Sequence, residues 1–549
     1  MCGIHATIAA SEENSLIPPS LHERLRRRGP DHAGSVTRRL DFGYEPLFLS
    51  LTSTVLSLRG DAIAKQPLVD SATGSILCWN GEAWRIQGQP VQGNDAQAVL
   101  SRLSAADRHG LDSSHADSVL DVLRAIEGPF AFIYLDYPAR RLFYGRDRLG
   151  RRSLLIKPGD PFSLCSVAGS PAAAWVEVEA DGCYFLQLDA RSDASAKFVP
   201  ARCAWAQDPN LVSSLGVFNA ATPTANVKLT RQSHSVAQLR QKLEASLQPR
   251  VLHVPVPPQA SPSDARIAVL FSGGLDCTVL ARLTSHVLPA DQAIDLISVA
   301  FENPRVAAQH PSASQADLYE LCPDRVTSRR SFEELLQVCP KRTWRLVTVN
   351  VSYSLASSHR SEVINLMYPH NTEMDLSIAY ALYFAARGHG SCQESPGSED
   401  GSYATTARVL LSGLGADELF GGYVRHATAF SRNGYSGLVE ELKLDMSRLG
   451  KRNLGRDDRV MAHWEREVRF PYLDEALAKW AIESPVWDKC DFENQGHDEG
   501  VEPGKRVLRL LAEGLGMGVV AREKKRAIQF GARTAKMESG KVKGTALVD

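Results

Sequence analysis

Residues 267–280 constrain the fold of this chain more than any other stretch. Residues 267–271 are apolar and predict a short buried strand, and Gly273 and Gly274 follow almost at once. Glycine has no Cβ, so this turn can be sharp and can bring its backbone close to a bound group. We expect a helix to begin near Asp276, and its N-terminus together with the turn amides would attract an anion. The stretch therefore predicts a phosphate-binding strand–turn–helix unit in an α/β domain.

This turn is not a Walker A loop, because the Gly-Lys-Ser/Thr ending is missing. It resembles the SGGxDS loop of ATP pyrophosphatases, which split ATP into AMP and pyrophosphate while activating a carboxyl or carbonyl oxygen. The resemblance implies an ATP site made of Leu270, Ser272, Gly273, Gly274, Leu275, Asp276 and Cys277. Cys277 stands where the family has its last serine. The alternative is an ordinary strand–turn–helix whose glycines serve geometry alone.

A second loop of the same kind lies further along the chain. Residues 409–423 again join an apolar strand to a glycine turn and an acidic residue, Asp417. Short apolar strands at 296–301 and 344–351 alternate with helices, which favours a parallel sheet that binds its ligand at the carboxyl ends of the strands. Asp276 and Asp417 could then share Mg²⁺ over a leaving pyrophosphate.

The second loop and three later segments resemble the synthetase domain of the asparagine synthetase family. The segments are residues 456–459, 467–474 and 522–526. The resemblance adds the backbone of Val299 beside adenine, Ser412 and Gly413 to the ATP site. It also implies a late lysine near the phosphates. Lys525 fits this position best, and Arg526 is an alternative because the spacing to the following phenylalanine differs by one residue.

The N-terminus carries a candidate nucleophile. Removal of Met1 would make Cys2 the first residue, and its α-amine could then act as general base for its own thiol. A cysteine in this position could equally be a small apolar core residue.

Motifs that follow Cys2 favour the catalytic interpretation. Residues 28–31, 79–82, 94–95 and 145–150, in this order, resemble a class II glutamine amidotransferase domain. The resemblance implies an αββα N-terminal-nucleophile sandwich over residues 2–200, with Cys2 as nucleophile. Oxyanion donors would be the Asn80 side chain and the Gly81 amide. The residues around glutamine would be Leu56, Asn80, Gly81, Glu82 and Asp95.

Three positions depart from the family pattern. Val55 replaces the arginine that clamps the glutamine carboxylate, and a valine cannot make that bidentate contact; Arg59 is the possible substitute. Leu414 replaces a glutamate that is a candidate base for ammonia in the family. Asp375 stands where the family has an arginine, so it should repel an aspartate substrate.

The length of 549 residues requires more than one core. We expect the amidotransferase domain at 2–200, a linker at 201–235 and a parallel-sheet α/β ATP-pyrophosphatase domain, of the adenine nucleotide alpha hydrolase-like type, at 236–549. Residues 388–405 are expected to be a solvated insertion.

The amino-acid composition argues against some classes of binding partner. Lys plus Arg number 62 and Asp plus Glu 63, so no net field attracts nucleic acid or an anionic membrane. No apolar run is long enough for a membrane span, the N-terminus lacks the order of a signal peptide, and ten scattered cysteines suggest reduced thiols. We therefore expect a cytoplasmic protein that uses small molecules, namely glutamine, ATP and a carboxylate such as aspartate. The sequence implies no particular oligomeric state.

Three functions fit these residues. The first is an amidotransferase of the asparagine synthase (glutamine-hydrolysing) type, in which ammonia released at Cys2 attacks an acyl-adenylate. The second uses the same mechanism on another carboxylate, because Leu414 and Asp375 alter the acceptor side. The third is a nucleotide-binding paralogue that has lost catalysis and acts as a scaffold or regulator.

Overall fold

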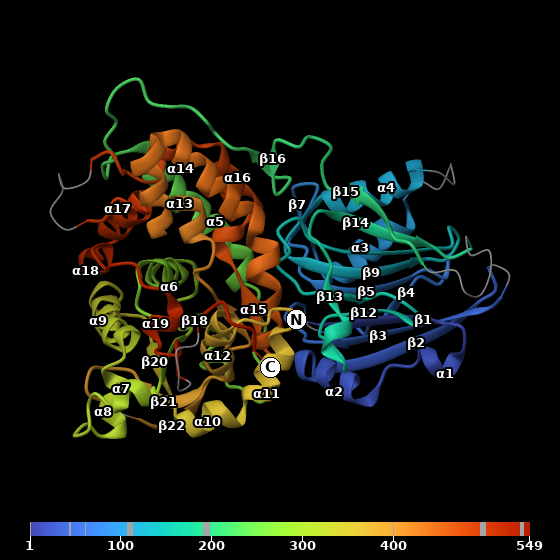
Figure 1. Cartoon of the computed structure of the whole chain (residues 1–549), viewed down its shortest axis with the longest axis horizontal. Helices are drawn as coiled ribbons and strands as arrows, with labels where there is room; N and C mark the ends of the chain where they lie inside the picture. Colours follow the sequence, from blue (N-terminus) through green and yellow to red (C-terminus); the bar gives the residue numbers. More distant parts are fainter. Residues whose placement is uncertain are drawn as a thin grey trace. The chain divides into compact units, whose positions relative to one another are not determined.

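The computed structural model describes residues 2–42, 45–60, 62–106, 113–189, 198–398, 400–494, 501–537 and 543–548. The chain forms two compact units (Figure 1). Unit 1 comprises Met1–Pro209, Asn365–His370 and Leu449–Glu465, and unit 2 comprises Asn210–Ile364, Asn371–Arg448 and Arg466–Asp549. Residues 365–370 and 449–465 thus belong to unit 1, although they lie within the range 236–549 expected to form the ATP-pyrophosphatase domain.

Unit 1 contains two six-stranded antiparallel sheets. The first has the order β13-β11-β12-β1-β3-β2, and its strands are β1 Gly3–Ala9, β2 His32–Leu40, β3 Leu47–Val55, β11 Leu155–Lys157, β12 Phe162–Cys165 and β13 Val176–Glu177. The second has the order β15-β14-β10-β9-β5-β4, and its strands are β4 Leu68–Val69, β5 Ile76–Gly81, β9 Phe130–Asp136, β10 Arg141–Arg146, β14 Gly182–Gln187 and β15 Ala201–Ala204. Strand β15 falls within the span expected to be linker.

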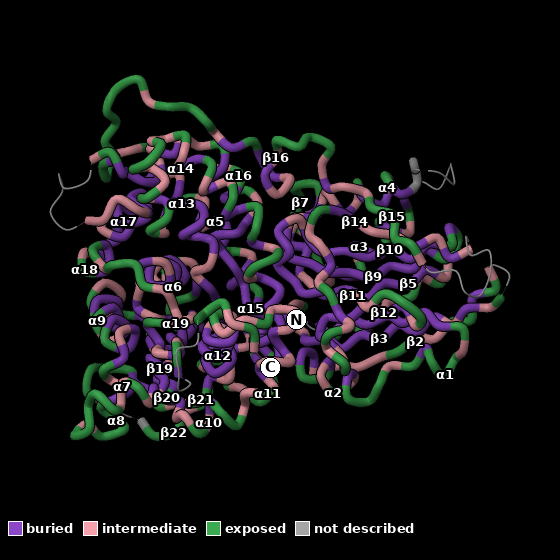
Figure 2. Tube along the Cα trace, viewed as in Figure 1, coloured by how far each residue is buried: buried purple, intermediate pink, exposed green. Residues whose placement is uncertain are grey.

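The core of unit 1 follows from side-chain alternation along these strands. Ile4 of β1 and Cys78 of β5 lie in one apolar cluster between the two sheets. The neighbouring residue Trp79 faces the other way, into a cluster formed with helices α3 (Asp95–Ser104) and α4 (Ser113–Arg124). Helix α2 (Pro19–Arg28) covers the first sheet through Leu25. The two sheets pack on each other with helices on their outer faces, and Figure 2 shows their central strands buried, so the expected αββα sandwich is confirmed.

Unit 2 is built on a seven-stranded sheet of order β22-β21-β20-β19-β18-β23-β24. Its strands are β18 Ile267–Leu270, β19 Ile294–Phe301, β20 Trp344–Val351, β21 His389–Gln393, β22 Asp400–Ala404, β23 Val409–Leu411 and β24 Glu467–Arg469. Five of these strands, in the order β20-β19-β18-β23-β24, pair in parallel. The expected parallel-sheet α/β domain is therefore confirmed.

Most of the described residues in segment 388–405 are exposed, as expected of a solvated insertion, but the segment is folded into two strands of the sheet. Strands β21 and β22 form an antiparallel hairpin that pairs with β20 and extends the sheet. Cys392 and Gln393 are buried there. A parallel-sheet edge offers unpaired backbone groups, and this hairpin satisfies those of β20.

Helices cover both faces of the parallel sheet. The Ser298 hydroxyl of β19 lies 2.9 Å from the Ser328 hydroxyl of α9 (Pro323–Val338). The Phe301 ring, on the opposite face of β19, packs on the Phe384 ring of α12 (Glu373–Arg387) with centroids 5.7 Å apart. This arrangement leaves the carboxyl ends of the strands as the place for a ligand.

The remaining elements are short connections and peripheral helices. The helices are α1 Glu12–Ser15, α5 His234–Val251, α6 Leu275–Val287, α7 Pro304–Ala307, α8 Gln315–Glu320, α10 Tyr353–Ser358, α11 Arg360–Met367, α13 Ala416–Phe420, α14 Val424–Arg452, α15 Leu454–Ala462, α16 Glu475–Glu483, α17 Arg506–Gly514, α18 Gly518–Ala521 and α19 Ile528–Gly531. The short strands are β6 Arg85–Ile86, β7 Gln89–Pro90, β8 Ile126–Glu127, β16 Leu211–Val212 and β17 Gly216–Val217. Within the described ranges, no helix has both the length and the apolar character that crossing a membrane requires.

Candidate active sites

Cys2 stands directly before β1, and three elements fix its backbone. Its backbone nitrogen donates to Asn80 Oδ1 at the end of β5, over 3.0 Å. Arg28 Nε, at the end of α2, donates to the Cys2 carbonyl over 3.3 Å. The next amide, of Gly3, donates to Thr54 Oγ1 in β3 over 3.1 Å. The backbone nitrogen of the candidate nucleophile is thus held against the side chain expected to form the oxyanion hole.

Asn80 has a free donor at this site. The side chain is fully buried, and its Nδ2 has no hydrogen-bond partner among the residues that the structure describes. A buried amide N–H without a partner costs free energy, so such groups are uncommon and call for an explanation. One explanation is that this N–H donates to a substrate oxygen when negative charge develops on it. Packing requires a glycine at position 81, because a Cβ added to Gly81 would lie 2.4 Å from the Pro129 carbonyl oxygen.

Asp95 is buried at the start of α3. Its Oδ2 accepts hydrogen bonds from Trp79 Nε1 at 3.1 Å and from the Ala83 amide at 2.8 Å. Burial raises the pKa of the Asp95 carboxyl, and the Ala83 amide and Arg59 oppose that shift. A substrate ammonium would favour the charged form further, which suits the expected role at the α-amino end of glutamine.

Arg59 lies beside the carboxylates of Glu82 and Asp95. Its Nη1 is 3.7 Å from Glu82 Oε2 and donates to the Ala83 carbonyl over 2.9 Å, and its Nη2 donates to the Val91 carbonyl. The guanidinium therefore stands among the residues expected around glutamine, as required of a substitute for the missing clamp. Leu56 is also buried here.

The backbone of Val55 is held in place by residues 29 and 31. It is buried at the end of β3, and its carbonyl accepts a hydrogen bond from the Asp31 amide at 3.0 Å. Gly29 packs against this backbone so closely that an added Cβ would lie 2.5 Å from the Val55 nitrogen.

A buried ion pair supports Arg28 from far along the sequence. Arg28 Nη2 donates to Asp458 Oδ2 of α15 over 2.8 Å, and both side chains are almost wholly buried. The same carboxylate accepts from the Ser153 amide at 3.2 Å. Sequence motifs assigned residues 456–459 to the ATP half, whereas α15 packs in unit 1, and no local pattern could have indicated that.

The first glycine loop of unit 2 joins β18 to α6, which begins at Leu275, next to Asp276, where a helix start was expected. Gly273 has a φ of +75°, and an added Cβ would lie 2.4 Å from the Ser328 amide of α9. Ser331 Oγ donates to the Gly273 carbonyl over 2.6 Å. Cys277 Sγ donates to the Gly274 carbonyl over 3.3 Å, so the cysteine stabilises the loop.

The second glycine loop lies directly beside the first. Strands β18 and β23 are parallel neighbours, with Val269 opposite Leu411. Gly413 then passes so close to the first loop that an added Cβ would lie 2.9 Å from Asp276 Cβ. The structure therefore brings the two sequence-predicted loops together. Ser412 is buried and its amide donates to the Arg469 carbonyl of β24 over 3.0 Å.

Asp276 and Asp417 converge on one ammonium group. Lys505 Nζ lies 2.8 Å from both carboxylate oxygens of Asp276 and 2.8 Å from Asp417 Oδ1. Lys525 Nζ contacts the other oxygen of Asp417. The two carboxylates raise the pKa of the Lys505 amine even though burial opposes this. Burial would raise the pKa of Asp417, but Lys505 and Lys525 hold it well below its usual range.

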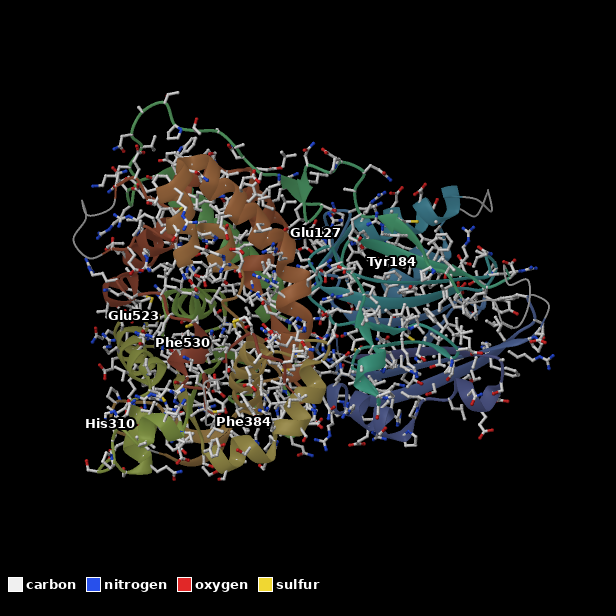
Figure 3. The ribbon with its side chains drawn as sticks, in the orientation of Figure 1. Glu127, Tyr184, His310, Phe384, Glu523 and Phe530 are labelled. Carbon is white, nitrogen blue, oxygen red and sulfur yellow. The ribbon has the colours of Figure 1, made fainter. Side chains whose placement is uncertain are left out.

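Lys505 was missed by the sequence reasoning. It precedes the amphipathic helix α17, where a lysine has no distinctive pattern, so only the fold reveals it. Lys525, by contrast, was expected from the resemblance, and its ammonium contacts Asp417. Its neighbour Arg526 instead donates to Thr327 Oγ1 over 3.2 Å, so the structure favours Lys525 over Arg526 on the acidic pair. Figure 3 labels Glu523 and Phe530, which flank Lys525 and Arg526 in the sequence.

The acidic pair fits a divalent cation that arrives with phosphate. Within the described part of the chain, no cluster of three or more His, Cys, Asp and Glu side chains could hold a metal. Mg²⁺ is commonly held by one or two carboxylates together with substrate phosphates and water, and two carboxylates are available here. The Lys505 ammonium already acts as a stand-in, because a single cation contacts both side chains.

The other expected residues lie as follows. Val299 is half-buried in β19, near the carboxyl end of the strand next to β18. Leu414 is half-buried in the second loop, and its amide donates to Ser412 Oγ over 3.3 Å. Asp375 lies in the first turn of α12 and is bound to the N-cap residue: the Thr372 hydroxyl accepts from the Asp375 amide over 3.2 Å and donates to the Asp375 carboxylate at 2.5 Å. This contact gives Asp375 a structural role that the sequence comparison did not anticipate.

Comparisons with known proteins show which families the chain resembles. The model of the glutamine amidotransferase domain matches residues 1–179, and the asparagine synthase model matches residues 402–439 and 431–546. Asparagine synthetase domain-containing protein 1 of Mus musculus is 32% identical, over 99% of this chain and 98% of its own length. An asparagine synthetase domain-containing protein of Saccharomyces cerevisiae is 34% identical, over 91% of this chain and 86% of its own length. One of Drosophila melanogaster is 31% identical, over 97% of this chain and 98% of its own length.

Proposed function

Since the chain belongs to the asparagine synthetase domain-containing protein family, we propose that it is an ATP-dependent amidotransferase. It hydrolyses glutamine in unit 1 and uses the ammonia in unit 2 to amidate a carboxylate. The observation that carries this proposal is the meeting of two glycine loops, which brings Asp276 and Asp417 onto one cation. Aspartate, as in the asparagine synthase reaction, is the first acceptor to test.

In the glutaminase half, Cys2 is the nucleophile after removal of Met1. The freed α-amine lies at the position from which the Cys2 nitrogen now contacts Asn80 Oδ1, 3.0 Å away. That amine accepts the thiol proton, the thiolate sulfur attacks the glutamine amide carbon, and ammonia leaves. The unpartnered Asn80 Nδ2 and the Gly81 amide stabilise the oxyanion, and water then releases glutamate from the thioester.

Glutamine is oriented by charged side chains around the nucleophile. Glu82 and Asp95 bind its ammonium group, and Arg59 binds its carboxylate. Leu56 supplies an apolar wall.

In the synthetase half, the acceptor carboxylate attacks the α-phosphorus of ATP and pyrophosphate leaves. The backbone of residues 272–277 and 412–413 binds the phosphates, with Leu270 and Val299 toward the adenosine. Asp276 and Asp417 would hold Mg²⁺, which would neutralise the negative charge of the leaving pyrophosphate. Lys525 contacts the same phosphate oxygens, and ammonia finally displaces AMP from the acyl-adenylate.

Two substitutions, at Leu414 and Asp375, bear on the choice of acceptor. Leu414 cannot accept a proton, so the family's candidate base is missing from the second loop. The loss of this base favours the second candidate function, in which a carboxylate other than aspartate is amidated by the same mechanism. The absence of the base does not affect the adenylation step, which needs the phosphate loops alone.

The test measures AMP, pyrophosphate and glutamate in one reaction. The full chain is supplied with Mg·ATP, glutamine or ammonia, and a panel of carboxylates that begins with aspartate. We expect AMP and pyrophosphate with one member of the panel. Cys2→Ser should lose the glutamine-dependent rate and keep the ammonia-dependent rate. Asp276→Asn should lose both, because an amide is a poorer ligand for a hard cation. Nucleotide binding without AMP formation for any carboxylate would favour the scaffold alternative.

A further inference from the structure

Lys505 is held rigidly between the two acidic side chains of the ATP site. Its backbone nitrogen donates to the Phe420 carbonyl at the end of α13 over 2.9 Å, and α13 is the helix that carries Asp417. Its own carbonyl accepts from the Leu508 and Arg509 amides in the first turn of α17. It also adopts a left-handed φ of +55°, which few residues with a Cβ do. The ammonium is therefore placed by the backbone on both sides and by burial, unlike a surface lysine.

The ammonium occupies the position that a metal ion would need. Each of its contacts with Asp276 and Asp417 measures 2.8 Å, and the Lys505 side chain is only 3% exposed. A metal that bridges the same two carboxylates must displace it. With Lys525 on Asp417 as well, two carboxylates face two ammonium groups, and the cluster carries no net charge. A free divalent cation thus finds an occupied and neutral site.

A triphosphate changes this balance. Its negative charge gives the displaced ammonium a new partner, and its oxygens complete the octahedral coordination that two carboxylates cannot provide. A buried ammonium moved without such a partner would be left uncompensated, at high cost.

We propose that Lys505 is a built-in counter-cation that excludes free divalent metal from Asp276 and Asp417, so that metal enters only together with a nucleoside triphosphate. This proposal rests on the function proposed above for the same site. It makes Lys505 the residue that couples metal binding to nucleotide binding, and it leaves the ligand-free acidic pair neutralised. Lys525 differs, because its side chain is 26% exposed and its ion pair is with Asp417, whereas Lys505 bridges both carboxylates. It serves as the matched control.

The experiment measures Mn²⁺ binding to the full chain by the electron paramagnetic resonance signal of free Mn²⁺. Four samples are compared, each with and without α,β-methylene-ATP: wild type, Lys505→Met, Lys525→Met and Lys505→Met combined with Asp417→Asn. Without nucleotide, Lys505→Met should bind Mn²⁺ about ten- to a hundredfold more tightly than wild type, since a competing charge-assisted contact is gone. Lys525→Met should change this affinity much less. The double variant should lose the gained affinity, which places the ion on the acidic pair.

The nucleotide arm provides a check that needs no variant. In wild type, α,β-methylene-ATP should tighten Mn²⁺ binding at least about tenfold beyond the affinity of the analogue itself for Mn²⁺. The same coupling should be smaller in Lys505→Met. Thermal unfolding of each sample shows whether a variant has folded. If Lys505→Met does not fold, the wild-type comparison alone decides the question.

Two results would overturn the proposal. One is wild-type protein that binds Mn²⁺ as tightly without nucleotide as with it, and the other is folded Lys505→Met with unchanged Mn²⁺ affinity. Failure of the proposed function is a separate result, namely absence of nucleotide binding in calorimetry. In that case the comparison of wild type with Lys505→Met in the absence of nucleotide still tests Lys505.

Discussion

The free donor on Asn80 leads to a quantitative prediction for the glutaminase reaction. Asn80→Ala removes Nδ2, which is buried and has no partner within the described residues, and also removes the contact of Oδ1 with the Cys2 nitrogen. Loss of one oxyanion donor typically lowers kcat about 10²- to 10³-fold, or roughly 2.7–4 kcal/mol in transition-state stabilisation. Because the donor is unpaired before charge develops, the KM for glutamine should change little.

The control for Asn80→Ala removes a neighbouring contact but no donor to the substrate. Thr54→Val takes away the acceptor for the Gly3 amide, next to the nucleophile, while leaving Asn80 intact. It should lower stability and reduce glutaminase kcat far less than Asn80→Ala does. The assay is glutamate release at varied glutamine, run beside the ammonia-dependent formation of AMP, which should be spared in both variants.

The result that would refute this reasoning is a glutaminase kcat for Asn80→Ala close to that of wild type. An equal loss of the ammonia-dependent rate would also refute it, because Asn80 would then act on the whole fold rather than on the oxyanion.

Three further predictions concern single residues. Arg59→Met should raise the KM for glutamine about ten- to a hundredfold with little change in kcat, because a clamp on the substrate carboxylate acts equally in ground and transition states; an unchanged KM would remove Arg59 from the pocket. Intact-mass spectrometry should show that Met1 is absent and that a glutamine-like electrophile labels Cys2 before the other nine cysteines, whereas retained Met1 would leave no α-amine to act as base. Burial raises the pKa of Asp324 from 3.8 to about 7, so the unfolded chain releases this proton first and stability falls as pH rises through that interval. Asp324→Asn should therefore raise Tm more at pH 8 than at pH 4, and an equal effect at both would contradict the assignment.

Local patterns predicted the parts of the sites that are themselves local. The strand–glycine–acid order at residues 267–276 and 409–417 carries its own geometry, and both loops lie where it indicated. At Asp375 the sequence also contains a local signal, although this residue was interpreted only as the replacement of a family arginine. Its spacing from Thr372 is that of a helix N-cap contact, and the structure has that contact.

The parts that were missed depend on contacts between distant segments. Lys505 reaches Asp276 across the fold, and no pattern near residue 505 indicates the partner. The ion pair of Asp458 with Arg28 joins α15 to a helix more than four hundred residues earlier. The hairpin β21–β22 forms because the edge of β20 is available, a fact about the sheet rather than about residues 389–404. Such contacts follow from the topology and not from the composition of either partner.

The central claim is that one chain takes nitrogen from glutamine and transfers it to a carboxylate at the expense of ATP. The most direct measurement supplies glutamine labelled with ¹⁵N in the side-chain amide, together with Mg·ATP and the carboxylate panel, and follows products by mass spectrometry. We expect ¹⁵N in a new amide, with one AMP and one glutamate formed for each amide. Glutamate release with no labelled amide and no AMP for any carboxylate would contradict the account.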